Sequence, residues 1–393
     1  MGEQGIPVPF PRQLIHQPAK IRLDYFKAYT VAHPALKQAD QAVWNTLREP
    51  AGASLIFVFG PTGVGKTTLL AQIEKRLVEL ALAQGAEQPG HLAVLRLDAV
   101  SPALNQFKWG DYYQRALLLL QEPSVEYTVD YRGQLPGIFR TTREREPWHV
   151  RRSTDTAALR LAFEQTLRLR KPRAILIDDA EHIAKAARGS KLLDQLDHVK
   201  SLATMAKTVH VLVGTYDLLV VRNLSAQLSR RSVDVHFSRY RATDDNEIRA
   251  FKSVLWTFQR NLPLEEEPDL LQHWKYCYER TIGCVGVLKD WLTRVLAEAL
   301  ESGEKTLSRH LLERHALSID RCDQMMTEAM AGETVLTEDD NAAYRLRVRL
   351  GLEQGPAQQH KQVKGQGSSH TRSSQRVGQR KPQRDPVKNS EVS

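Results

Sequence analysis

Short apolar runs alternate with longer amphipathic segments in the first part of the chain. The apolar runs lie at 55–59, 91–98, 174–178 and 209–215. Runs of this kind, without regular polar interruptions, are typical of parallel strands buried on both faces. The segments 67–85, 109–122, 155–169 and 190–207 instead repeat apolar residues every three or four positions, as amphipathic helices do. Strands that alternate with helices predict an α/β fold with a parallel sheet of βαβ units.

The pattern changes after residue 244. Residues 245–331 contain only segments with helical spacing, which predicts a separate helical domain. Before the first apolar run, 35–48 also has helical spacing, whereas the first 20 residues are rich in proline and predict an extended arm. We therefore expect an N-terminal arm and helix, an α/β domain, a helical domain, and a C-terminal helix followed by a basic tail. The corresponding boundaries are 1–50, 51–244, 245–331 and 332–393.

Composition and charge narrow the class of protein. Hydrophobic residues make up 41% and charged residues 26% of the chain, as in ordinary globular proteins. The sequence has no apolar window long enough to span a membrane, no secretory pattern at its start, and three cysteines without metal-ligand spacing. A cytoplasmic protein with no membrane partner is expected. Most of the net charge of +9 lies in 361–393, a Gln-, Ser- and Gly-rich tail that could either solubilise the protein or tether it to a partner.

The clearest chemical motif is GPTGVGKT, residues 60–67, between an apolar strand and a helix. Glycines at this spacing let backbone N–H groups surround phosphates, and the helix that follows directs its positive end toward them. We expect ATP phosphates to contact the loop and the start of the helix. The residues are Gly60, Pro61, Thr62, Gly63, Val64, Gly65, Lys66, Thr67 and Thr68. Lys66 would bring a full charge to the terminal phosphates, and the Thr67 hydroxyl would bind Mg²⁺.

Two adjacent carboxylates, Asp178 and Asp179, follow directly on the apolar run 174–178. Such a pair at the end of a buried strand costs free energy unless a cation compensates it. We expect this strand to lie beside the first one, with Asp178 as a Mg²⁺ ligand and Asp179 polarising the attacking water. Glu181 is an alternative for the second role. The competing interpretation of the pair is a helix N-cap, a position that favours Asp.

Three further positions are candidates for contacts with nucleotide. Thr215, at the end of 209–215, could hold the lytic water or could belong to an ordinary turn. Arg230 and Arg231 could supply an arginine finger to a neighbouring subunit, or could be solvated cations at the end of a helix. Lys289, one turn past Gly286, could touch the phosphates when the helical domain closes over them, or could be a solvated charge.

The series GPTGVGKT, ILIDD, LVGT and SRR, followed by a helical domain, resembles an AAA+ ATPase over about residues 40–300. Within that group the chain resembles the transposon-encoded TniB/TnsC regulators of target-site selection. The segments that carry this resemblance are YTVAHPALKQADQAVWNTL, QLDHVKSLA before VLVGTYDLL, and TIGCVGVLKDWLTRVL.

The resemblance implies a P-loop AAA+ core with a five-stranded parallel sheet, followed by an α-helical lid domain. The Asp-bearing strand is then not beside the first strand. It also implies a slow, regulatory ATP hydrolase, with ATP at subunit interfaces of a homo-oligomer. The oligomer is a ring or helical filament on double-stranded DNA that links a target-selection protein to a transposase in DNA transposition. Lys66, Thr67, Asp178, Thr215 and an arginine of SRR match the family pattern. The second acid is Asp179 instead of Glu, a difference that concerns the rate of hydrolysis more than nucleotide binding.

Basic residues cluster between the second and third apolar runs and are candidates for DNA contact. With Lys108 they are Arg132, Arg140, Arg143, Arg145, Arg151 and Arg152. They could contact DNA phosphates, or could belong to a solvated hairpin. The alternative function for the whole protein is an ATP-driven switch or scaffold without a DNA role. An initiator-type ATPase would carry a duplex-reading domain after the lid, and 332–393 is too short and polar for one.

Overall fold

The protein is described here by a computed structural model that covers residues 10–84, 91–100, 107–120, 155–185, 190–222, 229–337 and 340–353. The six arginines predicted to contact DNA between residues 132 and 152 lie outside these ranges, as does the basic tail. The chain divides into two units, 1–337 and 338–393, and nearly all of the described elements belong to the first.

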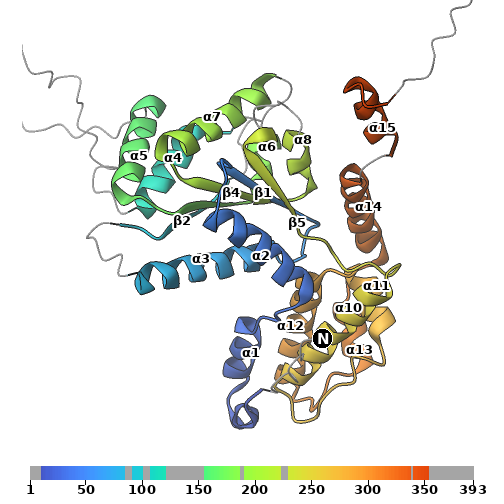
Figure 1. Ribbon diagram of the computed structural model, residues 1–393. Coiled ribbons are helices and arrows are strands. Elements are labelled where there is room, and N and C mark those ends of the chain that lie inside the picture. The colour runs from blue at the N-terminus through green and yellow to red at the C-terminus, as the bar shows by residue number, and fades with distance from the viewer. Residues whose placement is uncertain are drawn as a thin grey trace, which may run out of the picture. The chain divides into compact units, whose positions relative to one another are not determined.

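Five parallel strands form one sheet in the order β2-β3-β4-β1-β5 (Figure 1). Their bounds are β1 Leu55–Phe59, β2 Val94–Asp98, β3 Ala174–Asp178, β4 Val209–Gly214 and β5 Ser232–His236. The prediction of a P-loop AAA+ fold with a five-stranded parallel sheet is confirmed. The expectation that the Asp-bearing strand lies beside the first strand is wrong, because β4 lies between β3 and β1 and pairs with both.

Helices cover both faces of the sheet. On one face, α2 Pro34–Arg48 and α3 Lys66–Ala83 pack against the side chains of Ile56, Val58 and Val211. On the other face, α4 Trp109–Leu119, α5 Thr156–Arg170 and α7 Ser190–Ala206 pack against Phe57 and Ile177. Residues of β1, β3 and β4 are buried throughout because helices cover them on both sides, which explains their continuous apolar runs. The short helices α6 Glu181–Lys185 and α8 Leu219–Arg222, with the 3₁₀ turn η4 Tyr216–Leu218, follow β3 and β4.

The helical domain consists of α10 Asp245–Asn261, α11 Trp274–Thr281, α12 Val285–Ser302 and α13 Arg309–His315. Its core surrounds the fully buried ring of Trp291. The first 20 residues, predicted to be extended, contain a 3₁₀ turn, η1 Arg12–His16, and the start of a helix, α1 Ala19–Ala28. The ring of Phe26 in α1 is fully buried in the core of the helical domain. Phe26 is the only buried residue of α1, so this helix has no apolar stripe that a periodicity argument could detect.

A long helix, α14 Ile319–Leu336, follows the helical domain and runs across the predicted boundary at 331/332. It packs on η4: a Cβ atom built on Gly332 would lie 2.1 Å from the ring of Tyr216, so only glycine fits there. The last described helix, α15 Asp340–Arg349, belongs to the second unit. Among the described helices, none combines the length and the hydropathy that crossing a membrane requires.

Candidate functional site

The GPTGVGKT motif forms a tight loop between β1 and α3. Gly63 and Gly65 have φ values of 75° and 116°, in the left-handed region that glycine adopts without strain. Only glycine fits at position 60, because a Cβ atom there would lie 2.1 Å from the carbonyl oxygen of Phe237. The helix α3 starts at Lys66, so its free N–H groups face the loop. The combination of left-handed glycines and a helix N-terminus is a suitable cradle for phosphates.

Lys66 spans the loop that precedes it. Its Nζ donates to the carbonyl oxygens of Gly60 at 3.0 Å and Pro61 at 2.9 Å. Burial lowers the pKa of Lys66, while nearby acidic groups raise it, and Glu181 has the strongest effect among them. Asp178 and Asp179 act on the pKa in the same direction more weakly. The Lys66 ammonium therefore interacts with three carboxyl groups at the end of β3 and just after it.

Thr67 and Asp178 meet although they come from strand ends that are not adjacent in the sheet. The Thr67 hydroxyl lies close enough to Asp178 to lower the pKa of that carboxyl, and the backbone N–H of Asp179 donates to Asp178 Oδ1 at 3.1 Å. Asp178 is 5% exposed, and burial raises its pKa, while Thr67 and the backbone of Asp179 oppose the rise. The guanidinium of Arg96 on β2 lies 3.7 Å from Asp178 Oδ2. The two predicted Mg²⁺ ligands therefore lie together beside the phosphate loop.

Asp179 and Glu181 occupy different environments. Asp179 is exposed, and its φ of 50° places it in the left-handed region, which Asp tolerates better than most residues. Glu181 is 6% exposed, and its Oε2 accepts a hydrogen bond from the backbone N–H of Thr215 at 3.3 Å. Gly214 leaves the room for this carboxylate, because a Cβ atom there would lie 2.2 Å from Glu181 Oε2. Both carboxylates that the sequence offered for the attacking water therefore follow β3, and of the two Glu181 is the buried one.

Thr215 lies at the end of β4, as the apolar run indicated. Its hydroxyl donates to Asp217 at 3.3 Å, and Asp217 pairs with Lys185 at 2.8 Å. A cavity of about 960 Å³ opens beside these residues, and its walls include Pro61, Thr62, Glu181 and Thr215. The opposite wall is α14, through Met325, Glu328, Ala329 and Gly332 among others. One space therefore connects the phosphate loop, the ends of β3 and β4, and α14.

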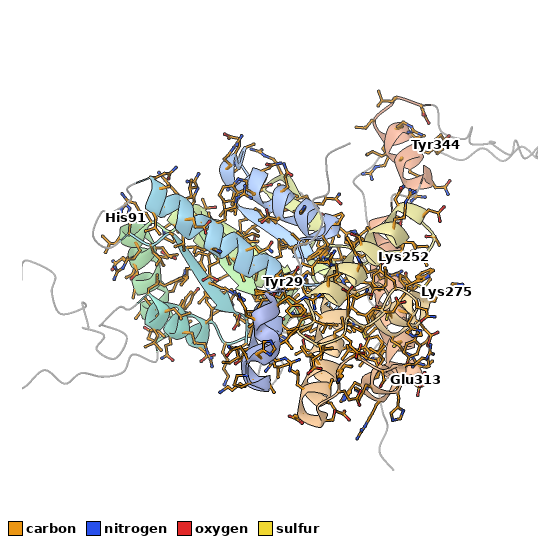
Figure 2. All side chains as sticks on the ribbon, turned by 90° about the horizontal axis from the view of Figure 1, so that it is seen from below. Tyr29, His91, Lys252, Lys275, Glu313 and Tyr344 are labelled. Atoms are coloured by element: carbon orange, nitrogen blue, oxygen red, sulfur yellow. The ribbon has the colours of Figure 1, made fainter. Side chains whose placement is uncertain are left out.

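The expected contact of Lys289 with phosphates is not what the structure shows. The Lys289 ammonium donates to the carbonyl oxygens of Phe26 and of Tyr29, the latter at 2.9 Å, and lies 3.8 Å from the centre of the Phe26 ring. Tyr29, labelled in Figure 2, comes directly after α1. Burial lowers the pKa of Lys289 to about 8. The free carbonyl groups at the C-terminal end of a helix attract a cation, so Lys289 attaches α1 to the helical domain.

Other residues of the helical domain do reach the phosphate loop. The backbone N–H of Val287 donates to the carbonyl oxygen of Gly63 at 3.0 Å. Gly286 lies so close that a Cβ atom on it would be 2.5 Å from the same oxygen. Cys284, fully buried at the start of α12, is close enough to Lys66 for the two groups to affect each other's pKa. The first turn of α12 thus rests on the loop, and the small residues GCVG were the signal in the sequence.

Arg239 connects the residues before α12 to α14, and no motif in the sequence pointed to it. It follows β5, is 5% exposed, and pairs with Glu333 of α14 through Nε at 2.8 Å and Nη2 at 3.1 Å. Its Nη1 also donates to the carbonyl oxygen of Ile282 at 3.4 Å. Its positive charge opposes the rise that burial causes in the pKa of Cys284, so Arg239 lies near the first turn of α12. No local motif marks an arginine whose partner lies 94 positions away.

Arg230 and Arg231 lie away from this cluster. They precede β5, and β5 runs parallel to β1, so they are at the edge of the sheet opposite the phosphate loop. Arg230 is exposed, and Arg231 donates to the Thr204 hydroxyl at 3.4 Å. Neither can complete the site of its own chain, because the length of β5 separates them from it. Lys108 is exposed just before α4.

Comparisons with known proteins find one family match and several similar solved structures. Residues 48–221 match the family model of the AAA domain. No curated protein matches the sequence. Among solved structures, the chain is similar to the ORC2 protein of Aeropyrum pernix in ADPNP-ADP complexes, with 16% identity over 74% of this chain and 70% of that chain, at a TM-score of 0.47. It is similar to Drosophila ORC bound to DNA, with 13% identity, coverage of 90% and 88%, and a TM-score of 0.48. A Walker-type ATPase of Pyrococcus abyssi has 14% identity, coverage of 84% and 81%, and a TM-score of 0.39. Residues 48–221 thus match an AAA domain, and the strand order and the phosphate loop are those of the P-loop AAA+ fold.

Proposed function

We propose that this protein binds ATP with Mg²⁺, hydrolyses it slowly, and assembles on double-stranded DNA as a homo-oligomeric ring or filament. In that form it links a target-selection protein to a transposase in DNA transposition, in the cytoplasm. The observation that carries the ATPase part is the phosphate loop itself, in which left-handed glycines and the start of α3 surround Lys66, with Thr67 and Asp178 beside it. A Mg²⁺-bound triphosphate requires oxygen ligands for the ion and a positive charge for the phosphates. The Thr67 hydroxyl and the Asp178 carboxylate offer the first, and Lys66 offers the second.

The residues of the loop fit both the nucleotide and the ion. Backbone N–H groups of 60–67 would hold the phosphates, and Lys66 would pair with the terminal ones. Thr67 and Asp178 offer the hard oxygen ligands that Mg²⁺ prefers. When bound, the ion neutralises charge on the phosphate oxygens. Thr215, held by its backbone N–H to Glu181, is placed at the edge of the same cavity and would contact the terminal phosphate or the water.

The DNA and transposition parts of the proposal rest on the sequence. The segments shared with the TniB/TnsC regulators and the basic cluster between 132 and 152 support them, together with Lys108. Contacts of this kind reach DNA phosphates, so binding should be weakly sequence-specific and should weaken steeply as salt rises. Arg230 or Arg231 would act on ATP held by a neighbouring subunit, which agrees with their position at the far edge of the sheet.

Binding and hydrolysis are tested with Lys66→Ala and Asp178→Asn. We expect Lys66→Ala to bind ATP at least 10-fold more weakly, because a full charge is lost at the phosphates. Asp178→Asn should abolish the Mg²⁺ dependence of binding and reduce hydrolysis. The measurements are calorimetric titration with ATP in the presence and absence of Mg²⁺, and phosphate release. If ATP binds equally well to wild type and Lys66→Ala, the loop is not the nucleotide site.

Assembly is tested by electron microscopy of the protein with double-stranded DNA, with and without ATP. Rings or filaments that need both ATP and DNA, and that Lys66→Ala fails to form, would support the DNA-assembled ATPase. Charge reversal of Arg140, Arg143 and Arg145 to Glu should then remove DNA binding and leave ATP binding intact. Normal ATP binding without any DNA-dependent assembly would instead favour the alternative, an ATP-driven switch or scaffold.

A further inference from the structure

We propose that Glu181, not Asp179, is the carboxylate that orients and deprotonates the water attacking the terminal phosphate of bound ATP. This inference rests on the proposed ATPase function. In the step, the water oxygen forms a bond to the terminal phosphorus as the bond from that phosphorus to the bridging oxygen breaks. The electron pair of the broken bond leaves on ADP. Glu181 takes one proton from the water and later releases it to solvent.

The first argument is where the carboxylate lies. Glu181 is in the first turn of α6, directly after β3, and lines the cavity that also contacts Pro61, Thr62 and Thr215. Of the acidic groups that raise the pKa of Lys66, it has the strongest effect. Lys66 is the cation that would pair with the terminal phosphates. Glu181 is therefore close enough to Lys66 to interact with it, and it shares a cavity with Pro61 and Thr62 of the phosphate loop.

The second argument is how firmly it is held. Glu181 Oε2 accepts from the backbone N–H of Thr215 at the end of β4, at 3.3 Å. Gly214 provides the space for that oxygen, since a Cβ atom there would lie 2.2 Å from it. A carboxylate that is 6% exposed loses much of its hydration, so burial without a function for the charge would be costly. Fixed position and partial desolvation are properties that a general base needs.

The third argument is that Asp179 has another explanation. Its φ of 50° is in a region that non-glycine residues rarely adopt, and Asp is among the residues that tolerate it. Its backbone N–H donates to Asp178 Oδ1, so residue 179 forms the turn that orients the Mg²⁺ ligand. Its own side chain is exposed. The residue type at 179 therefore follows from the turn and needs no role in proton transfer.

A purely structural role for Glu181 would also explain the contact with Thr215, and glutamine separates the two roles. Glu181→Gln keeps a side-chain oxygen for the Thr215 N–H and removes the basic carboxylate, whereas Glu181→Ala removes both. Asp179→Asn is the matched control, since it makes the same chemical change two residues away. Each variant is measured for ATP affinity by titration, for thermal unfolding, and for hydrolysis in a single turnover. The nucleotide that remains bound after gel filtration is identified by chromatography.

We expect Glu181→Gln to bind ATP within about 3-fold of wild type, to unfold at the same temperature, and to hydrolyse ATP at least about 100-fold more slowly. It should retain ATP after gel filtration, whereas wild type and Asp179→Asn retain ADP. The proposal is overturned if Asp179→Asn is the variant that traps ATP. It is also overturned if Glu181→Gln hydrolyses ATP like wild type and only Glu181→Ala is impaired, which would leave a structural role. Failure of the proposed function looks different: wild type would then bind no ATP, and no variant would trap any.

Discussion

Burial changes the pKa of single side chains in this protein, and at His210 the change affects stability. It lies in β4 with 0% exposure, its Nδ1 donates to the carbonyl oxygen of Thr208 at 3.1 Å, and its Nε2 is buried without a hydrogen-bond partner. Burial lowers its pKa from 6.5 to about 4. The side chain is therefore neutral in the folded protein at any pH near 7.

This depressed pKa predicts acid sensitivity. The unfolded chain takes up a proton at His210 as the pH falls below 6.5, while the folded chain does not until about pH 4. The stability that the protein gains from a neutral His210 is therefore fully present above pH 6.5 and is lost as the pH falls toward 4. At pH 5 the expected loss is about 2 kcal/mol of unfolding free energy. Urea unfolding at pH 7.5 and pH 5 measures it.

His210→Leu should lose less stability than wild type between these two pH values, because the titrating group is gone. His33 and His198 also have pKa values lowered to about 4 by burial, so part of the acid effect should remain. Replacement of the exposed His310 by Gln is the control and should leave the difference between the two pH values unchanged. Equal pH dependence in wild type and His210→Leu would contradict the prediction.

At the scale of elements, two helices bring distant parts of the chain to the phosphate loop. The first turn of α12 contacts Gly63 directly, and α14 forms a wall of the adjoining cavity. Both contacts depend on glycines without room for a side chain, Gly286 and Gly332. Each can therefore be disturbed by one methyl group.

Gly286→Ala should weaken ATP binding more than it weakens the fold. Alanine favours a helix over glycine by about 1 kcal/mol, which offsets part of the cost. Its Cβ atom would nevertheless lie 2.5 Å from the Gly63 carbonyl oxygen and would push α12 off the loop. Titration with ATP and thermal unfolding of the same variant separate the two effects. Ser302→Ala, in the last turn of α12, is the control. Unchanged ATP affinity in Gly286→Ala would mean that α12 is not part of the nucleotide site.

The pair Arg239–Glu333 should hold α14 in place. Glu333→Gln leaves the buried guanidinium without its charged partner, and we expect a loss of about 2 kcal/mol, because Ile282 and Tyr278 still accept from Arg239. Hydrogen exchange should then speed up along α14 and remain unchanged in β1. Glu328→Gln, in the same helix, should have little effect. Exchange that is equally slow in Glu333→Gln and wild type would show that packing on Tyr216 alone secures α14.

How far the sequence predicts this architecture depends on how local each signal is. The runs 55–59 and 209–215 are apolar throughout because helices cover both faces, so their strands are predictable. The edge strand β5 pairs only with β1 and buries only one of its five residues, so SVDVH has no such run. The partner of Lys289 could not be predicted, because it lies 260 positions away in the chain. The sequence also left the choice between Asp179 and Glu181 open, because the contact that holds Glu181 comes from a residue 34 positions away. The phosphate loop is marked by eight consecutive residues, so its sequence was sufficient to predict it, although its packing on Phe237 and α12 was not predictable.

At the scale of the whole molecule, the two ends of β5 are expected to serve two different ATP sites, one in the same subunit and one in a neighbour. Its C-terminal end leads to Arg239 beside the chain's own phosphate loop, and its N-terminal end carries Arg230 and Arg231 at the opposite edge. A strand of five residues is about 16 Å long. If subunits assemble head to tail, β5 has the phosphate loop of its own subunit at one end. At the other end it carries arginines that would act on ATP bound to the neighbouring subunit.

Mixing experiments test this arrangement. Lys66→Ala lacks a working loop but keeps its arginines, and Arg231→Ala lacks the arginine but keeps its loop. We expect each variant alone to have little activity and an equimolar mixture to recover a measurable fraction of wild-type phosphate release. A mixture with the double variant Lys66→Ala, Arg231→Ala instead of Lys66→Ala is the control and should not recover. Full activity of Arg231→Ala alone would contradict a role for this residue between subunits.

The attachment of α1 determines which parts of the protein can turn together. Arg22 donates to the Pro263 carbonyl oxygen at 2.8 Å, and Lys289 donates to the Tyr29 carbonyl oxygen at the end of α1. Labels at the exposed Ile21 and Glu301 should therefore keep one distance in dipolar spectroscopy whether or not nucleotide is present, and the distance from Ile21 to Val78 on α3 would report any movement between the helical domain and the sheet. A protein captured on a surface through its first residues would therefore be held by its helical domain.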